Sequence, residues 1–172
     1  MMNNRIRIVV YGGVLSAVIL LATSIIKFPI PTGYGYINFG DGAIFAAAAI
    51  MGPYAAISAA LGSALADLVA SYPMYIPATA VIKGVMGLIA GYMLNKHRAM
   101  PWYLMLLLFL ICEAIMVFGY FFYEWALYAS FAAAAGQLIF NAVQGVAGII
   151  TGLAIVPLAR KIKISQFNGD MV

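Results

Sequence analysis

Charged side chains are scarce in this sequence. Only 8% of its 172 residues are Asp, Glu, Lys or Arg, whereas soluble domains carry about 25%. Hydrophobic residues make up 66% of the chain, and a soluble fold of this length could not bury so much apolar surface. The composition therefore predicts an integral membrane protein.

Side chains suited to metal or covalent chemistry are equally rare. The single cysteine, Cys112, lies inside an apolar segment, where it can form no intramolecular disulfide and is best explained as a small buried hydrophobe. The single histidine, His97, has no neighbouring cysteine or carboxylate, so a metal site is not expected. No phosphate-binding glycine motif and no Ser-His-Asp arrangement fits the sequence. We therefore expect neither an enzyme nor a cofactor, and any uphill transport would need energy from a partner or an ion gradient.

Long apolar segments dominate what is present. They are continuous rather than alternating, which favours helices over the strands of a membrane barrel. Gly, Pro and polar stretches divide the chain into six segments: residues 6–26, 40–51, 54–71, 76–94, 102–123 and 132–160. The second would reach only about 18 Å, short of the roughly 30 Å hydrocarbon core. The prediction is a single all-α membrane domain over residues 1–172, a compact bundle of six transmembrane helices.

The basic residues are distributed as membrane topology requires. The net charge of +4 could suggest a nucleic-acid partner, but most basic residues stand at the ends of apolar segments. With six spans, both termini and the loop after the fourth helix share one side. That side holds seven of the nine Lys and Arg residues: Arg5, Arg7, Lys96, Arg98, Arg160, Lys161 and Lys163. Because cytoplasmic loops are enriched in Lys and Arg, we predict that both termini are cytoplasmic and that no nucleic acid is bound.

Polar side chains inside the apolar segments gather toward the predicted outer ends. Ionisable groups in a bilayer are costly and often mark ligand or ion paths. Glu113 is the deepest carboxylate and has no partner nearby in sequence, so it is expected to be protonated or bound to something. The outer set is Asn38, Asp41, Asp67, Lys83, Tyr120, Tyr123, Glu124, Gln137, Asn141 and Gln144. Such a set, open outside and closed inside, indicates a capture site rather than a continuous pore.

Each polar residue also has a structural interpretation. Asp41, between two glycines in "FGDGAIF", could cap the second helix, bind a ligand or pair with a cation. Asp67 and Lys83 could form an ion pair that makes both tolerable in lipid. Gln137 and Asn141 are four residues apart on one helix face, where they could join helices or bind a ligand.

The stretch "KFPIPTGYGYIN" is predicted to be the first outer loop. Tyr34 and Tyr36 alternate with glycines in it. Aromatic rings over a polar cavity can stack on a flat heterocycle, and glycines allow a loop to move as a lid. The alternative is an interfacial aromatic belt.

Small residues recur at helical spacing in the first segment. Gly12 with Ser16 and Gly13 with Ala17 form two pairs that allow another helix to approach closely. The approaching helix could belong to this chain or to a partner.

Three stretches carry a family resemblance: "INFGDGAIFAAAAIMGPYAA", "GSALADL" and "IPATAVIKGVMGLIAGY". The chain resembles the substrate-specificity subunits, or S components, of energy-coupling factor (ECF) vitamin transporters. The likeness covers nearly the whole chain and is strongest to the branch for riboflavin, pyridoxine, hydroxymethylpyrimidine and pantothenate. Gly13 and Ala17 match the position of the family's AxxxA motif, with Gly in place of the first Ala.

The resemblance implies a function in a prokaryotic plasma membrane. An S component captures a vitamin outside, under the first outer loop, and docks through its first helix on a transmembrane coupling subunit of the EcfT type that carries two ATPases. It then topples in the membrane and releases the vitamin inside. The implied substrate-binding residues are Tyr34, Tyr36, Asn38, Lys83, Glu113, Tyr120, Gln137 and Asn141, and the implied docking residues are Gly13 and Ala17. Asp41 and Asp67 are expected to be structural, and Lys83 could serve either role.

The charge balance bears on which vitamin is bound. Pantothenate would need a free cation, and Lys83 could already be paired with Asp67. A neutral or weakly basic heterocycle, pyridoxine or hydroxymethylpyrimidine, fits better, with Glu113 accepting from its ring nitrogen or amine. Pantothenate and riboflavin are the alternatives, and a ligand-free membrane scaffold is the alternative of another class.

Overall fold

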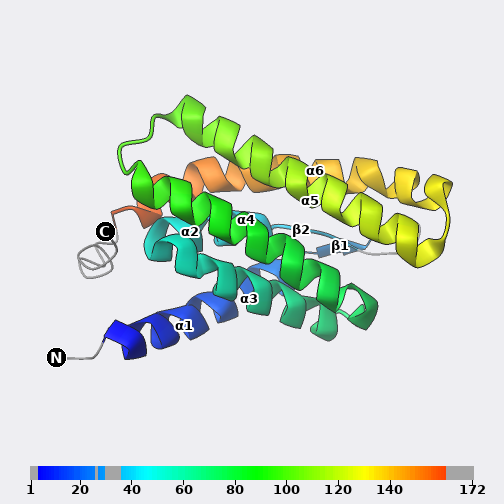
Figure 1. The fold of residues 1–172 in the computed structure, drawn as a ribbon, viewed down its shortest axis with the longest axis horizontal. Helices are drawn as coiled ribbons and strands as arrows, with labels where there is room; N and C mark the ends of the chain where they lie inside the picture. The colour runs from blue at the N-terminus through cyan, green and yellow to red at the C-terminus, as the bar shows by residue number, and fades with distance from the viewer. Residues whose placement is uncertain (1–3, 26, 30–35, 162–172) are drawn as a thin grey trace.

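The computed structural model describes residues 4–25, 27–29 and 36–161, and these form a helical bundle with one short hairpin (Figure 1). The hairpin and two short 3-10 turns connect the helices. The elements are α1 (Asn4–Ile25), β1 (Lys27–Pro29), β2 (Tyr36–Asn38), α2 (Gly40–Met51), η1 (Gly52–Tyr54), α3 (Ala55–Val69), η2 (Pro73–Tyr75), α4 (Ile76–Lys96), α5 (Trp102–Tyr128) and α6 (Phe131–Ala159). The predicted all-α class is confirmed, with each predicted segment containing a helix.

The largest difference in helix length is at α5. The helix continues to Tyr128 instead of ending at residue 123, because "YEWALY" keeps apolar residues at helical spacing despite its polar members. Ala129 ends it in the left-handed conformation, with φ of 51°. Ser130 then caps α6, its Oγ accepting a hydrogen bond from the Ala133 N–H at 3.2 Å.

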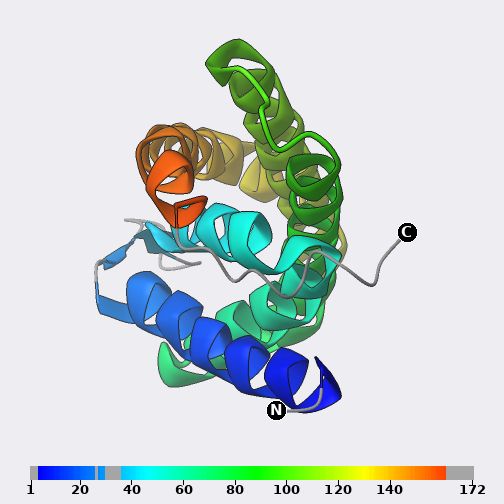
Figure 2. The same ribbon diagram turned by 90° about the vertical axis from the view of Figure 1, so that its left-hand side faces the viewer.

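The short helix α2 lies at the centre of the bundle. Seen end-on, it is surrounded by the longer helices (Figure 2), and Ile44 and Phe45 are completely buried. Gly52, with φ of 60°, ends α2 and is followed by Pro53 in η1. By length and composition, α2 and α3 can cross a bilayer only when Gly40–Val69 is taken as one stretch, which gives five candidate spans. The count of six spans therefore stays a prediction.

The first outer loop contains a feature that the sequence analysis did not predict. Its ends pair as an antiparallel hairpin, with Lys27 opposite Asn38 and Pro29 opposite Tyr36. Strands of three residues carry too little pattern to be recognised in a sequence. Tyr34 lies outside the described residues.

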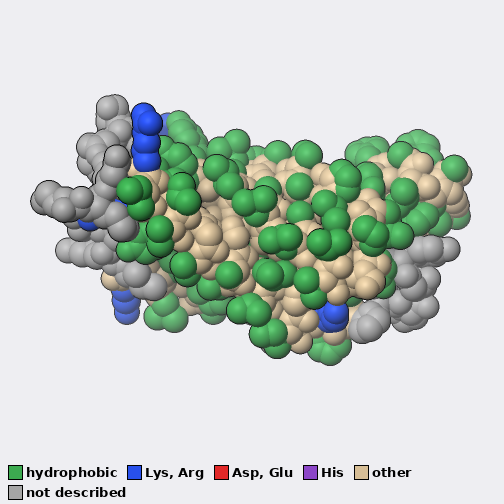
Figure 3. All heavy atoms as spheres, turned by 90° about the horizontal axis from the view of Figure 1, so that it is seen from below, with side chains coloured by type: hydrophobic (Ala, Val, Ile, Leu, Met, Phe, Trp, Pro, Cys, Tyr) green, Lys and Arg blue, Asp and Glu red, His purple; other side chains and the backbone are tan. Residues whose placement is uncertain are grey.

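The surface has an apolar face and one basic end. Hydrophobic side chains cover the face in Figure 3, and Lys and Arg gather mainly at one end. That end holds the start of α1, the end of α6 and the loop between α4 and α5 (Figure 1). The arrangement agrees with the charge pattern, and the assignment of this end to the cytoplasm remains a prediction.

Close packing of α4 on η1 generates the first prediction. A Cβ added at Gly91 would lie 2.1 Å from the Gly52 carbonyl oxygen, so backbone must move. We expect Gly91→Ala to destabilise the protein by about 1–3 kcal/mol. Gly136→Ala on α6 is the matched control, because its Cβ would meet nothing within 4 Å. Thermal unfolding in detergent checks this, and equal melting temperatures for the two variants would contradict it.

Candidate functional site

A polar cavity of about 50 Å³ lies between the hairpin, the ends of α3 and α5, the start of α4 and the middle of α6. Its lining combines aromatic hydroxyls, carboxyls and amides in a chain that is otherwise apolar. The lining residues are Tyr36, Asn38, Asp67, Tyr72, Tyr75, Thr79, Tyr120, Glu124, Asn141 and Gln144. Buried polar groups at this density are expensive in lipid and indicate a ligand site.

The hairpin contributes Tyr36 to the cavity wall. Its hydroxyl donates to Asp67 Oδ1 at 2.9 Å, and its ring centroid lies 5.7 Å from that of Tyr72. Burial, together with the Asp67 carboxylate, raises the pKa of Tyr36. The hydroxyl therefore stays protonated and remains a donor that holds the hairpin to α3.

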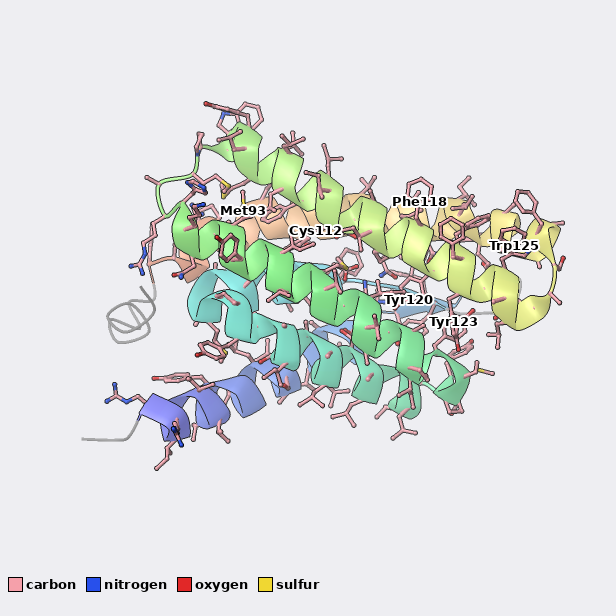
Figure 4. The ribbon with its side chains drawn as sticks, viewed as in Figure 1. Met93, Cys112, Phe118, Tyr120, Tyr123 and Trp125 are labelled. Carbon is pink, nitrogen blue, oxygen red and sulfur yellow. The ribbon has the colours of Figure 1, made fainter. Side chains whose placement is uncertain are left out.

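The opposite wall is formed by tyrosines from η2 and α5. Tyr75 donates to Glu124 Oε1 at 3.2 Å, and the hydroxyls of Thr79 and Tyr120 are 2.9 Å apart. Tyr120 and Tyr123 project inward from α5, whereas Phe118 projects outward (Figure 4) and is 57% exposed. Tyr123, outside the lining, donates to the Met74 carbonyl and so joins α5 to η2.

A buried ion pair lies next to the cavity. Lys83 Nζ is 2.5 Å from Asp41 Oδ1, and Gln144 Nε2 donates to Asp41 Oδ2 at 2.9 Å. The expected pairing of Lys83 with Asp67 is wrong. The sequence offered Lys83 two carboxylates, and the packing of α2 against α4 brings Asp41 to it.

Asn38, rather than Asp41, serves the start of α2. Asn38 Oδ1 accepts a hydrogen bond from the Gly40 N–H at 2.9 Å. The expected capping by Asp41 is wrong, because the N-cap residue of α2 is Phe39 and Asp41 lies within the first turn of the helix. Asn38 also donates through its Nδ2 to Gln144 Oε1 at 3.0 Å. This bond ties the hairpin to α6.

Glu113 is buried below this network. Neither of its carboxyl oxygens has a hydrogen-bond partner among the described residues. Its side chain lies against Gly145 and Gly148, where a Cβ at Gly148 would stand 2.3 Å from Oε1. The glycines on α6 thus make room for a carboxyl that lies outside the cavity lining.

The structure brings together half of the predicted binding set. Tyr36, Asn38, Tyr120 and Asn141 line the cavity, while Lys83, Glu113 and Gln137 are buried outside its lining. The predicted binding set did not include Tyr72 and Tyr75, which fall between the predicted segments 54–71 and 76–94. Nor did it include Asp67, Thr79, Glu124 and Gln144. For Asp67, Glu124 and Gln144 the signal was there, since all three belong to the outer polar set.

The small residues of α1 divide into two faces. Gly12 faces inward, where the Ser58 hydroxyl donates to its carbonyl at 3.1 Å. Gly13 and Ala17 are exposed, and a Cβ at Gly13 would meet nothing within 4 Å. Only the second pair is open to an incoming helix.

Comparison with known proteins decides the family. The family model of the ECF-type riboflavin transporter S component matches residues 3–161, nearly the whole chain. The chain belongs to this S-component family. A relative from Pyrococcus woesei, an uncharacterized protein in the gap 3' region, is 36% identical over 135 residues, covering 78% of this chain and 88% of its own.

Membership establishes the general role. The chain is a multi-pass protein of the cell membrane and a substrate-binding subunit of a vitamin transporter, not an enzyme. The family implies a small-molecule vitamin as substrate and an ECF module of EcfT and ATPases as partner.

The buried ion pair generates the second prediction. Lys83→Met leaves the Asp41 carboxylate buried without its cation and should cost about 3–5 kcal/mol. Adding Asp41→Asn removes the stranded charge and should restore much of the lost stability. The control combines Lys83→Met with Asp67→Asn and should restore little of the lost stability. Unfolding of the three variants in detergent measures this, and rescue through Asp67→Asn would show that the pairing is wrong.

Proposed function

We propose that this S component captures a flat nitrogen heterocycle, pyridoxine or hydroxymethylpyrimidine, in the cavity beneath the hairpin. The observation that carries the proposal is the lining itself. Four tyrosines surround carboxyl and amide groups, and none of the described lining residues is Lys or Arg. A ligand-free scaffold would have no need for so many buried polar groups around a cavity.

The lining chemistry favours this ligand class. Tyrosine rings offer flat apolar faces for stacking on a heterocycle. Asn141 Nδ2, which has no hydrogen-bond partner among the described residues, offers a donor to a ring nitrogen. Pantothenate fits less well, since its carboxylate would face Asp67 and Glu124 without a lining cation.

Binding requires the cavity to widen. Small-molecule sites usually enclose about 300–1,000 Å³, far above the 50 Å³ present. The hairpin and η2 are the short elements of the wall, so we propose that they move apart to admit the vitamin. Direct contacts of Tyr34, Lys83, Glu113 and Gln137 with the vitamin remain proposals, and those of Lys83 and Glu113 require the cavity to deepen toward the Asp41–Lys83 pair.

Riboflavin is the second candidate. The matching family is described as a riboflavin transporter S component, and the flavin ring system is also flat and rich in hydrogen-bonding groups. Riboflavin needs a wider opening of the cavity than pyridoxine or hydroxymethylpyrimidine, because its ring system is larger and carries a polyhydroxyl chain.

Equilibrium binding to a vitamin panel is the third prediction. Purified protein should bind pyridoxine or hydroxymethylpyrimidine saturably, with riboflavin as the second expected ligand. Tyr120→Ala should weaken binding at least about 10-fold, because it removes a stacking surface. Tight pantothenate binding without affinity for the other three would overturn the assignment, and no binding to any would favour the scaffold.

The exposed pair on α1 generates the fourth prediction. We propose that Gly13 and Ala17 form the docking face for the EcfT-type coupling subunit. Gly13→Leu and Ala17→Leu should abolish copurification of the coupling subunit with its two ATPases, because a bulky side chain prevents close helix approach. Vitamin binding should persist.

Gly136→Leu is the control for docking, since it adds the same side chain at another open glycine. It should copurify normally. Equal copurification of all three variants would place the docking face elsewhere.

A further inference from the structure

We propose that Asp67 and Glu124 select the substrate by its hydrogen-bond donors. Each carboxyl accepts a hydrogen bond from one donor of the ligand, and at least one of the two donors is an N–H. A ligand that bears a carboxylate is rejected. This inference rests on the proposed function and narrows it to donor-rich, carboxylate-free heterocycles.

Glu124 presents a buried acceptor to the cavity. Glu124 is 3% exposed, and its Oε1 accepts a hydrogen bond from the Tyr75 hydroxyl at 3.2 Å. Oε2 has no hydrogen-bond partner in the described part of the chain. Asn141 lies beside this carboxyl but makes no hydrogen bond of ordinary geometry to it. A buried carboxyl oxygen without a partner is unfavourable, and a ligand donor would relieve it.

Asp67 repeats the arrangement from another element. It is 7% exposed, Oδ1 accepts from Tyr36 at 2.9 Å, and Thr79 lies beside the carboxyl, but Oδ2 has no hydrogen bond of ordinary geometry among the described residues. Asp67 belongs to α3 and Glu124 to α5, and α4 packs against both helices. A ligand between them therefore meets acceptors supplied from two sides, each oriented by a tyrosine.

No described basic side chain in the lining neutralises these carboxyls. Lys83 is held by Asp41 at 2.5 Å, and Lys27 lies 5.9 Å from the Tyr36 ring centroid. Neither belongs to the lining. An N–H donor, strongest when its nitrogen is protonated, would supply the missing complement. A carboxylate would add repulsion at low dielectric.

Glu113 is buried like Asp67 and Glu124, but it does not line the cavity. Its unpartnered carboxyl packs on Gly145 and Gly148, while Asp67 and Glu124 border open volume. From the sequence, the expected acceptor for a ring nitrogen or amine is Glu113. The structure assigns it to Glu124 and Asp67, and the two assignments can be separated by mutation.

The test uses matched ligands on the full-length protein in detergent. The pairs are pyridoxamine with pyridoxic acid, hydroxymethylpyrimidine with the analogue whose amino group is replaced by hydrogen, and riboflavin with the derivative methylated at its ring N–H. For whichever vitamin binds, the donor-bearing member should bind at least about 10-fold more tightly. Equal affinities within that pair would overturn the inference.

The variants are Glu124→Gln, Asp67→Asn and Glu113→Gln, which change charge with little change in shape. The first two should weaken the donor-bearing ligand at least about 10-fold and reduce the preference within the pair. Glu124→Asp keeps the charge and should keep the preference. Loss of binding in Glu113→Gln, with normal binding in the other two, would return the role to Glu113.

The two proposals fail in different ways. Wild-type protein that binds none of these vitamins contradicts the proposed function. Wild-type protein that binds one of these vitamins but binds both members of its ligand pair equally contradicts only the role of Asp67 and Glu124. A variant that does not fold leaves the ligand pairs on the wild-type protein to decide.

Discussion

The buried ion pair between Asp41 and Lys83 is the constraint on which the centre of this protein depends. Two charges removed from water and lipid must satisfy each other closely, and here they do so at 2.5 Å. Asp41 lies on α2 and Lys83 on α4, so the pair fixes the position of a helix too short to span a bilayer alone. The longer helices surround α2 (Figure 2), and Asp41 is only 1% exposed.

The same network shapes the substrate cavity. Gln144 donates to Asp41 on one side and accepts from Asn38 on the other, so the ion pair and the hairpin are joined through one amide. Asn38 and Gln144 are also lining residues. A shift of the hairpin therefore disturbs an amide that helps to hold α2, which links the opening of the cavity to the packing of the bundle.

Sequence patterns predicted the helices well and their mutual contacts poorly. The boundaries of α2 followed from the glycine at its start and the Gly52–Pro53 pair at its end, which are local signals. The partner of Lys83 was not a local signal. Asp67 lies one helix before Lys83 and Asp41 two helices before it, and only packing chooses between them. Tyr72 and Tyr75 join the cavity because a turn folds over it, and turn residues give no periodic signal.

The small size of the cavity has a consequence for how affinity should be understood. A cavity of about 50 Å³ holds a few water molecules, so a heterocycle can enter only chains whose walls have parted. The measured dissociation constant is then the intrinsic one divided by the fraction of open chains. Tyr36→Phe loses the hydrogen bond to Asp67 but keeps the aromatic ring and the Asp67 carboxyl in the lining, so it would raise that fraction. Such a variant would bind more tightly than the natural protein, and its walls would part as readily for release as for entry.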